Sequence, residues 1–179
     1  MIFKPKKINP YTSKNSHAKD GFTLPEVIIT VGIIGILSSI ALPNYLRQIQ
    51  KTHQAEANAT VSQVLATVAA YVDEFGNQPK QWADLNSITY LMTDDGPINA
   101  DNGTLTTAIN LPGNRYQLIQ KNSENSDGYY IFEALSTNAT SVDFNVLACV
   151  DLTKGASHQM NGKHGNAAKT ESLKCRGRS

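Results

Sequence analysis

The chain has 179 residues, 40% of them hydrophobic, and a formal net charge of +1. This length accommodates one globular domain beside a long apolar segment near the N-terminus, and it excludes a chain of several sizeable domains. The near-neutral total conceals an asymmetry, because five lysines and one aspartate lie within the first 21 residues. Of the 16 basic and 15 acidic groups, 11 and 14 remain after residue 21, a net charge of −3.

Residues 1–21 form a basic leader, and residues 27–42 form a run that consists mostly of Val, Ile, Leu, Ala and Gly. Between Glu26 and Arg47 no charged residue occurs. As a helix, residues 22–42 rise about 31 Å, close to the roughly 30 Å of a bilayer's hydrocarbon core. We therefore predict a single membrane span with the leader on the cytoplasmic side and the rest of the chain outside the cytoplasmic membrane.

Glu26 is the exceptional residue of this segment, because a carboxylate in or near the hydrocarbon core costs several kcal/mol. One interpretation is that Glu26 interacts with the positive end of its own helix dipole. The other is that it meets a positive charge from another copy of the chain. Cleavage between Gly21 and Phe22 would create such a charge, a new α-amine at the start of the apolar helix.

The stretch Gly21-Phe-Thr-Leu-Pro-Glu26, preceded by a basic leader and followed by the apolar run, resembles the class III signal of type IV prepilins and related pseudopilins. The resemblance implies that prepilin peptidase removes residues 1–21 and that Phe22 becomes N-methylated. It also implies polymerisation, in which Glu26 pairs with the Phe22 amine of a neighbour. Pro25 stands where the family usually has an aliphatic residue, and the first turn of a helix tolerates proline.

An ordinary secretory signal peptide is the competing interpretation of the N-terminal segment. Its positive start fits, and residues 38–41, Ser-Ser-Ile-Ala, imitate a small-residue cleavage site. Glu26 and the length of the apolar run fit this interpretation poorly.

Residues 44–75 change to an amphipathic pattern, in which one helical face carries Ala57, Val61, Val64, Leu65, Val68, Val72 and Phe75. We expect one helix over residues 23–75, with residues 22–43 projecting and residues 44–76 packed on the globular domain. Gly32 and Gly35 weaken this helix, and Pro43 kinks or opens it, unless a loop at Pro43 ends the span. The resemblance implies that residues 35–43 melt in assembled filaments.

Residues 77–115 contain Pro, Gly and an acidic patch and are expected to form a connecting loop, with one helical turn that buries Trp82 and Leu85. Strand-like runs follow at residues 116–120, 129–135 and 142–150, separated by turn residues. Short connections make such strands antiparallel. The predicted fold class is α+β: a long N-terminal helix packed on a three- to four-stranded antiparallel sheet over residues 116–150, which matches the pilin roll.

Cys149 and Cys175 are the only cysteines, and in an exported domain an isolated pair indicates a disulfide, although two free thiols remain an alternative. The bridge would bound the C-terminal loop of residues 151–179, as in the resembled family. No zinc-ligand spacing accompanies His158 and His164, and Asp94, Asp95 and Asp101 match no EF-hand, so no metal or cofactor is predicted. The basic C-terminal residues give weak support for binding DNA or polysaccharide, against a plain solvated tail.

No nucleophile motif or glycine-rich phosphate loop is present, so an enzyme is not predicted. The resemblance implies a structural subunit of a type IV pilus, with adhesion, twitching motility and DNA uptake left open. Its implied partners are other copies of itself, prepilin peptidase, the inner-membrane assembly machinery and, before assembly, the bacterial inner membrane; afterwards it would be extracellular. A type II secretion pseudopilin, a minor pilin and a membrane protein that never polymerises are the alternatives.

Overall fold

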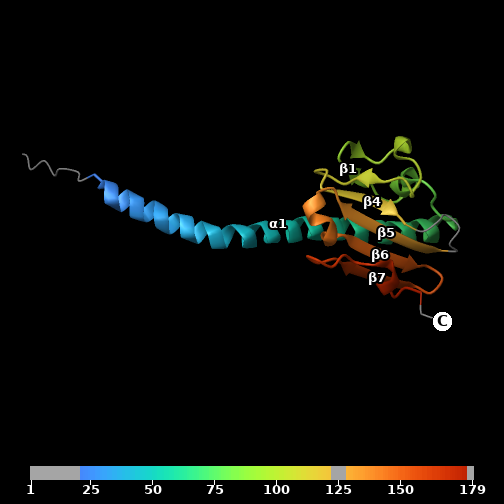
Figure 1. The fold of residues 1–179 in the computed structure, drawn as a ribbon. Coiled ribbons are helices and arrows are strands. Elements are labelled where there is room, and N and C mark those ends of the chain that lie inside the picture. Colours follow the sequence, from blue (N-terminus) through green and yellow to red (C-terminus); the bar gives the residue numbers. More distant parts are fainter. Residues whose placement is uncertain (1–20, 122–127, 177–179) are drawn as a thin grey trace, which may run out of the picture. The chain divides into compact units, whose positions relative to one another are not determined.

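A computed structural model describes residues 21–121 and 128–176 (Figure 1). The chain divides into two compact units, residues 1–42 and 43–179. Within the described part, the first unit is the beginning of helix α1 and the second is a globular unit that contains the rest of α1. Apart from Gly21, the predicted leader lies outside the described residues.

Helix α1 spans Leu24–Phe75, so the expectation of one helix over this range is confirmed. The alternative in which a loop at Pro43 ends the span is wrong, because Pro43 lies inside α1. A proline lacks only its own N–H bond, to the carbonyl four residues earlier, and a long helix retains the bonds on either side.

The main sheet has five antiparallel strands in chain order: β3 (Ile109–Asn110), β4 (Tyr116–Gln120), β5 (Tyr129–Ser136), β6 (Val146–Asp151) and β7 (Ala156–Asn161). The globular part of α1 runs along one face of this sheet (Figure 1). A small hairpin of β1 (Met92–Thr93) and β2 (Gly96–Pro97) lies in the connector. Short 3-10 helices are η1 (Trp82–Ser87), η2 (Ala100–Asn102), η3 (Ala139–Phe144) and η4 (Thr170–Ser172).

The hydrophobic core lies between α1 and the sheet. Val61, Val64 and Val68 of α1 are fully buried, as is Phe132 of β5. The connector closes the core, because the buried Trp82 of η1 packs with its ring centroid 6.0 Å from that of Phe132. The inward packing predicted for Trp82 and Leu85 is confirmed. The long helix on an antiparallel sheet is therefore the architecture that the sequence predicted.

Two strands of the main sheet were not predicted. β3 has two residues and lies in the expected connector, while β7 has the polar sequence ASHQMN and lies in the expected C-terminal loop. Gln159 of β7 meets polar groups of α1: Gln159 Nε2 donates to Asn58 Oδ1 (2.8 Å), and Ser62 Oγ donates to Gln159 Oε1 (2.8 Å). The sheet therefore has five strands rather than three or four.

The predicted strand over residues 142–150 begins only at Val146. Residues 142–144 belong to η3, because the Asn138 side chain accepts a hydrogen bond from Thr140 N and starts a 3-10 turn. The predicted face of α1 is also wrong at one end: Phe75 is half exposed and packs against Tyr71, which itself lies against the core.

Candidate functional site: the N-terminal helix and its surroundings

The start of α1 is built by Thr23 and Glu26. Thr23 precedes the first helical residue, Leu24, and Glu26 Oε2 accepts hydrogen bonds from Thr23 N (2.8 Å) and Thr23 Oγ1 (2.6 Å). A carboxylate at the third helical position that binds the N-cap amide is one half of a capping box. Sequence reasoning missed Thr23, although the signal, Thr-x-x-Glu at the start of an apolar run, is present in the sequence.

Gly21 and Phe22 lie before the helix, and the Phe22 side chain is 90% exposed. Pro25 occupies the first turn, where an N–H would have no partner within the helix. The predicted cleavage point is therefore part of an exposed, non-helical segment, and the predicted charge-pairing residue lies one turn further along the chain.

The apolar part of α1 has no covering partner among the described residues. Every large hydrophobic side chain from Val27 to Leu42 is between 48% and 66% exposed. Within the described chain, α1 is the one helix that is long and apolar enough to cross a membrane. A surface of this length and composition is stable in water only when lipid or other apolar helices cover it.

Gly32 and Gly35 have open surroundings, since a Cβ atom at either position would meet nothing within 4 Å. The fold of this chain therefore does not require glycine there. Together with Pro43, which removes the hydrogen bond to the Ser39 carbonyl, they are the weakest points of the exposed helix. Melting of this stretch in filaments stays a prediction.

The predicted disulfide is confirmed: Cys149 of β6 is joined to Cys175, with a Cα–Cα distance of 6.1 Å. Both residues are buried. The bridge ties the C-terminal segment to the face of β6 opposite the helix, because Val146, Ala148 and Val150 alternate with Cys149 and belong to the core beneath α1.

A buried polar cluster holds the same segment at its other end. Gln54 Nε2 donates to the carbonyl oxygens of Gly162 (2.8 Å) and Asn145 (3.1 Å). The Asn145 amide donates to Glu133 Oε1 (2.9 Å), and its Oδ1 accepts from Ala168 N (2.8 Å). The predicted apolar face of this helix begins at Ala57 and does not include Gln54, which is nevertheless buried.

One acidic residue of the connector has a structural role, because Asp94 Oδ1 accepts a hydrogen bond from Gly113 N at 3.0 Å. Within the described part of the chain, no group of three or more His, Cys, Asp or Glu side chains is placed to hold a metal ion. The described basic residues of the C-terminal segment are dispersed. Lys169 lines a cavity together with Glu133 and Glu171, and the Arg176 guanidinium lies 5.0 Å from the Tyr129 ring centroid.

Comparison with known proteins identifies the N-terminal segment. A family model described as the prokaryotic N-terminal methylation motif matches residues 16–42. The chain is 37% identical over 54 residues to the type IV major pilin protein PilA of Myxococcus xanthus (strain DK1622). This match covers 30% of the present chain and 24% of that pilin. No solved structure gives a significant match.

The chain therefore carries a prokaryotic N-terminal methylation motif on an exposed apolar helix, followed by a helix-on-sheet globular unit with a C-terminal disulfide. The particular relative is a type IV major pilin, to which the chain is distantly similar.

Proposed function

We propose that this chain is a structural subunit of a type IV pilus that polymerises through the first half of α1. The observation that carries the proposal is the uncovered apolar helix with a single carboxylate, Glu26, one turn after its start. Other copies of the same helix can cover such a surface, and exchanging lipid for other helices changes the hydrophobic free energy little.

In this proposal, prepilin peptidase cleaves after Gly21 and methylates the new amine of Phe22. Methylation keeps the amine cationic. The amine of one subunit then meets Glu26 of another in the apolar filament interior. An unpaired charge there costs several kcal/mol, so the pair fixes the axial register of the subunits more than it adds net stability.

In the single chain, the hydrogen-bond partners of Glu26 come from the same chain, so the amine of a neighbouring subunit can replace them. Thr23 N and Oγ1 stabilise the carboxylate until an amine replaces or joins them. Before assembly, the same helix would hold the precursor in the inner membrane with the leader in the cytoplasm. The assembly machinery would then extract the helix from the membrane. Adhesion, twitching motility and DNA uptake are all compatible roles.

The decisive experiment replaces Glu26 by Ala and measures sheared surface filaments by mass spectrometry. We expect export and leader removal to continue and filament yield to collapse, whereas Gly21→Val should leave an uncleaved precursor. Wild-type filament yield from Glu26→Ala would refute the proposal. A pseudopilin is the second candidate: the same variants would then abolish protein secretion, and the chain would be absent from sheared wild-type filaments.

A further inference from the structure

The globular unit has a cavity of about 680 Å³ whose described lining is rich in cationic side chains. Arg47 and Lys51 reach it from α1, and Lys163 and His164 reach it from the turn after β7. Phe144, at the end of η3, supplies an apolar wall. No carboxylate is among the described residues that line it.

The three cations of this cavity outnumber the acid beside it and form no ion pair among the described residues. The ion pairs found among the described residues use Glu56 and Glu133, and none of them includes Arg47, Lys51 or Lys163. A neighbouring acid, Asp143, accepts a hydrogen bond from Gly165 N at 2.9 Å. Three lysine and arginine charges thus converge in a chain whose net charge beyond residue 21 is negative. Such a site attracts an anion.

The position of the cavity along the chain indicates which anion. Arg47 follows Leu42, the last residue of the apolar run, by five residues, so the two lie within about 18 Å of each other whatever the backbone conformation. The intervening Tyr45 and Leu46 are 63% and 52% exposed. An exposed tyrosine just beyond an apolar span is typical of the lipid headgroup zone. Long Lys and Arg side chains near the end of a span can reach the headgroups from there.

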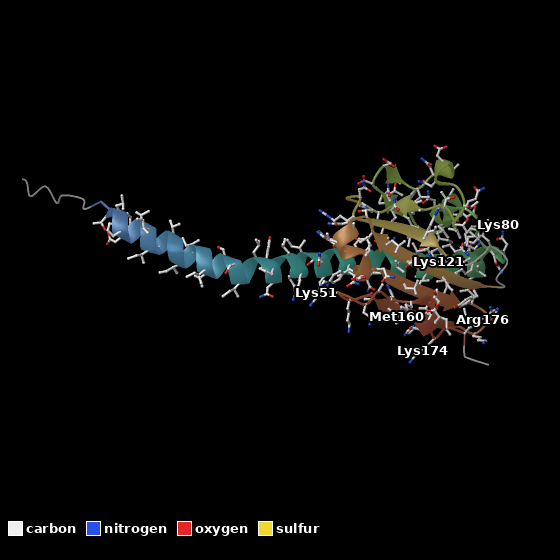
Figure 2. The ribbon with its side chains drawn as sticks, in the orientation of Figure 1. Lys51, Lys80, Lys121, Met160, Lys174 and Arg176 are labelled. Carbon is white, nitrogen blue, oxygen red and sulfur yellow. A yellow bond between two sulfur atoms is a disulfide. The ribbon has the colours of Figure 1, made fainter. Side chains whose placement is uncertain are left out.

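The distribution of the other cations disfavours nucleic acid. Figure 2 shows Lys51 at one end of the globular unit and Lys80 and Arg176 at the other end. Lys169 lines a different cavity, together with Glu133 and Glu171, so the basic residues do not form a continuous track along which a DNA backbone could lie.

We infer that Arg47, Lys51 and Lys163 bind the phosphate group of an anionic phospholipid while the chain is anchored in the membrane. This site rests on the proposed function for one point, the placement of residues 43–179 at the membrane surface. It holds the globular unit against the outer leaflet before assembly, and the lipid is released when the subunit is extracted.

The test uses the full chain, reconstituted into vesicles that contain phosphatidylglycerol and phosphatidylcholine. Native mass spectrometry then counts the lipids that stay bound after transfer to detergent. The wild-type chain should retain phosphatidylglycerol in preference to phosphatidylcholine. The double variant Lys51→Gln/Lys163→Gln should weaken this preference by about fivefold for each charge removed.

The matched control is Lys80→Gln/Lys174→Gln, which removes the same charge from exposed residues that do not line the cavity. It should retain phosphatidylglycerol as the wild type does. Equal lipid preference in the two double variants would overturn the inference. All four lysines are exposed, so circular dichroism spectra should coincide and exclude misfolding as the cause.

Two further arms separate other anions from the lipid. Inorganic phosphate and a short DNA duplex are each added to the detergent-solubilised chain. Displacement of phosphatidylglycerol by phosphate would support a headgroup site. DNA binding that depends on Lys51 and Lys163, without any lipid preference, would overturn the lipid inference. Filament yield is measured separately. Normal filaments without a lipid preference would contradict only the lipid site. A lipid preference without filaments would contradict only polymerisation.

Discussion

Gln54 and Gly162 are 108 residues apart in sequence, yet the Gln54 side-chain amide donates to the Gly162 carbonyl oxygen at 2.8 Å. Gly162 follows β7 and begins the segment that Cys175 ends with its bridge to β6. Gly162 N in turn donates to the Asn145 carbonyl oxygen, which Gln54 also binds. One buried side chain of α1 therefore fixes both the start of β6 and the end of β7.

Replacing Gln54 by Ala should lower the free energy of unfolding by about 2–3 kcal/mol. The variant removes the donor and leaves a buried backbone carbonyl without its hydrogen bond. Gln63→Ala is the matched control, because Gln63 is on the same helix and exposed. Thermal unfolding of the full chain in detergent measures both; equal melting temperatures for the two variants would show that the Gln54 contacts are unimportant.

Gly162→Ala tests the same junction from the other side. A Cβ atom at Gly162 would collide with the Asp143 carbonyl oxygen and the Asn145 side chain. The neighbours are backbone and a fully hydrogen-bonded amide, so they cannot move aside without breaking the cluster, and we expect a loss of about 2–4 kcal/mol. Gly32→Ala, where a Cβ meets open space, should not alter the melting temperature of the globular unit.

These contacts also mark the limit of what sequence patterns reveal. The apolar periodicity of α1 predicts the helix and its buried face because burial of valine and leucine repeats every turn. Gln54 and the polar strand β7 escape such reasoning because their burial depends on partners about 100 residues away. Residues 142–144 have a strand-like composition but form part of η3, because the Asn138 side chain caps this 3-10 helix.

The candidate site shows the same division. The methylation motif that contains Phe22 and Glu26 can be recognised because it is a local feature of the sequence. The disulfide could be predicted because no other cysteine competes. The cationic cavity could not, since Lys51 of α1 and Lys163 after β7 meet only because the fold packs α1 beside the end of β7, where Gln54 binds Gly162.

Removing the disulfide by Cys149→Ala/Cys175→Ala should lower the free energy of unfolding by about 3.5 kcal/mol, the loop entropy for a separation of 26 residues. The C-terminal segment would then be held by weaker contacts, chief among them the hydrogen bonds of Asn145 and Gln54 and the β7 ladder. Limited proteolysis should cut the variant after Lys169 or Lys174 much faster than the wild type. Unchanged cleavage rates at these sites would show that the hydrogen-bonded cluster suffices.

Two buried tyrosines predict a loss of stability in alkali. Burial raises the pKa of Tyr116 and of Tyr130 to about 12 from the ordinary value of 10.0. Between these values the unfolded chain releases protons that the folded chain retains, so stability is complete below pH 10 and falls as the pH rises toward 12, by on the order of 2 kcal/mol for each group.

Tyrosinate absorbance and circular dichroism, recorded together against pH, measure this effect. Tyr116→Phe should flatten the alkaline loss, because the phenol that donates to the Phe144 carbonyl oxygen at 2.8 Å is gone, at a cost in stability at neutral pH. An alkaline transition identical to that of the wild type would assign the loss to other groups. Tyr90→Phe is the control, since Tyr90 is 74% exposed.

The contact between Thr23 and Glu26 gives a prediction about assembly. In Thr23→Val, the hydroxyl that donates to Glu26 Oε2 at 2.6 Å is lost, whereas Thr23→Ser keeps it. If this hydroxyl orients the carboxylate toward the incoming amine, Thr23→Val should reduce filament yield severalfold, and Thr23→Ser should restore it. Precursor processing must be followed in parallel, because position 23 lies two residues after Gly21. A valine variant that is cleaved normally and assembles as the serine variant does would show that the backbone amide of residue 23 alone is enough to position Glu26.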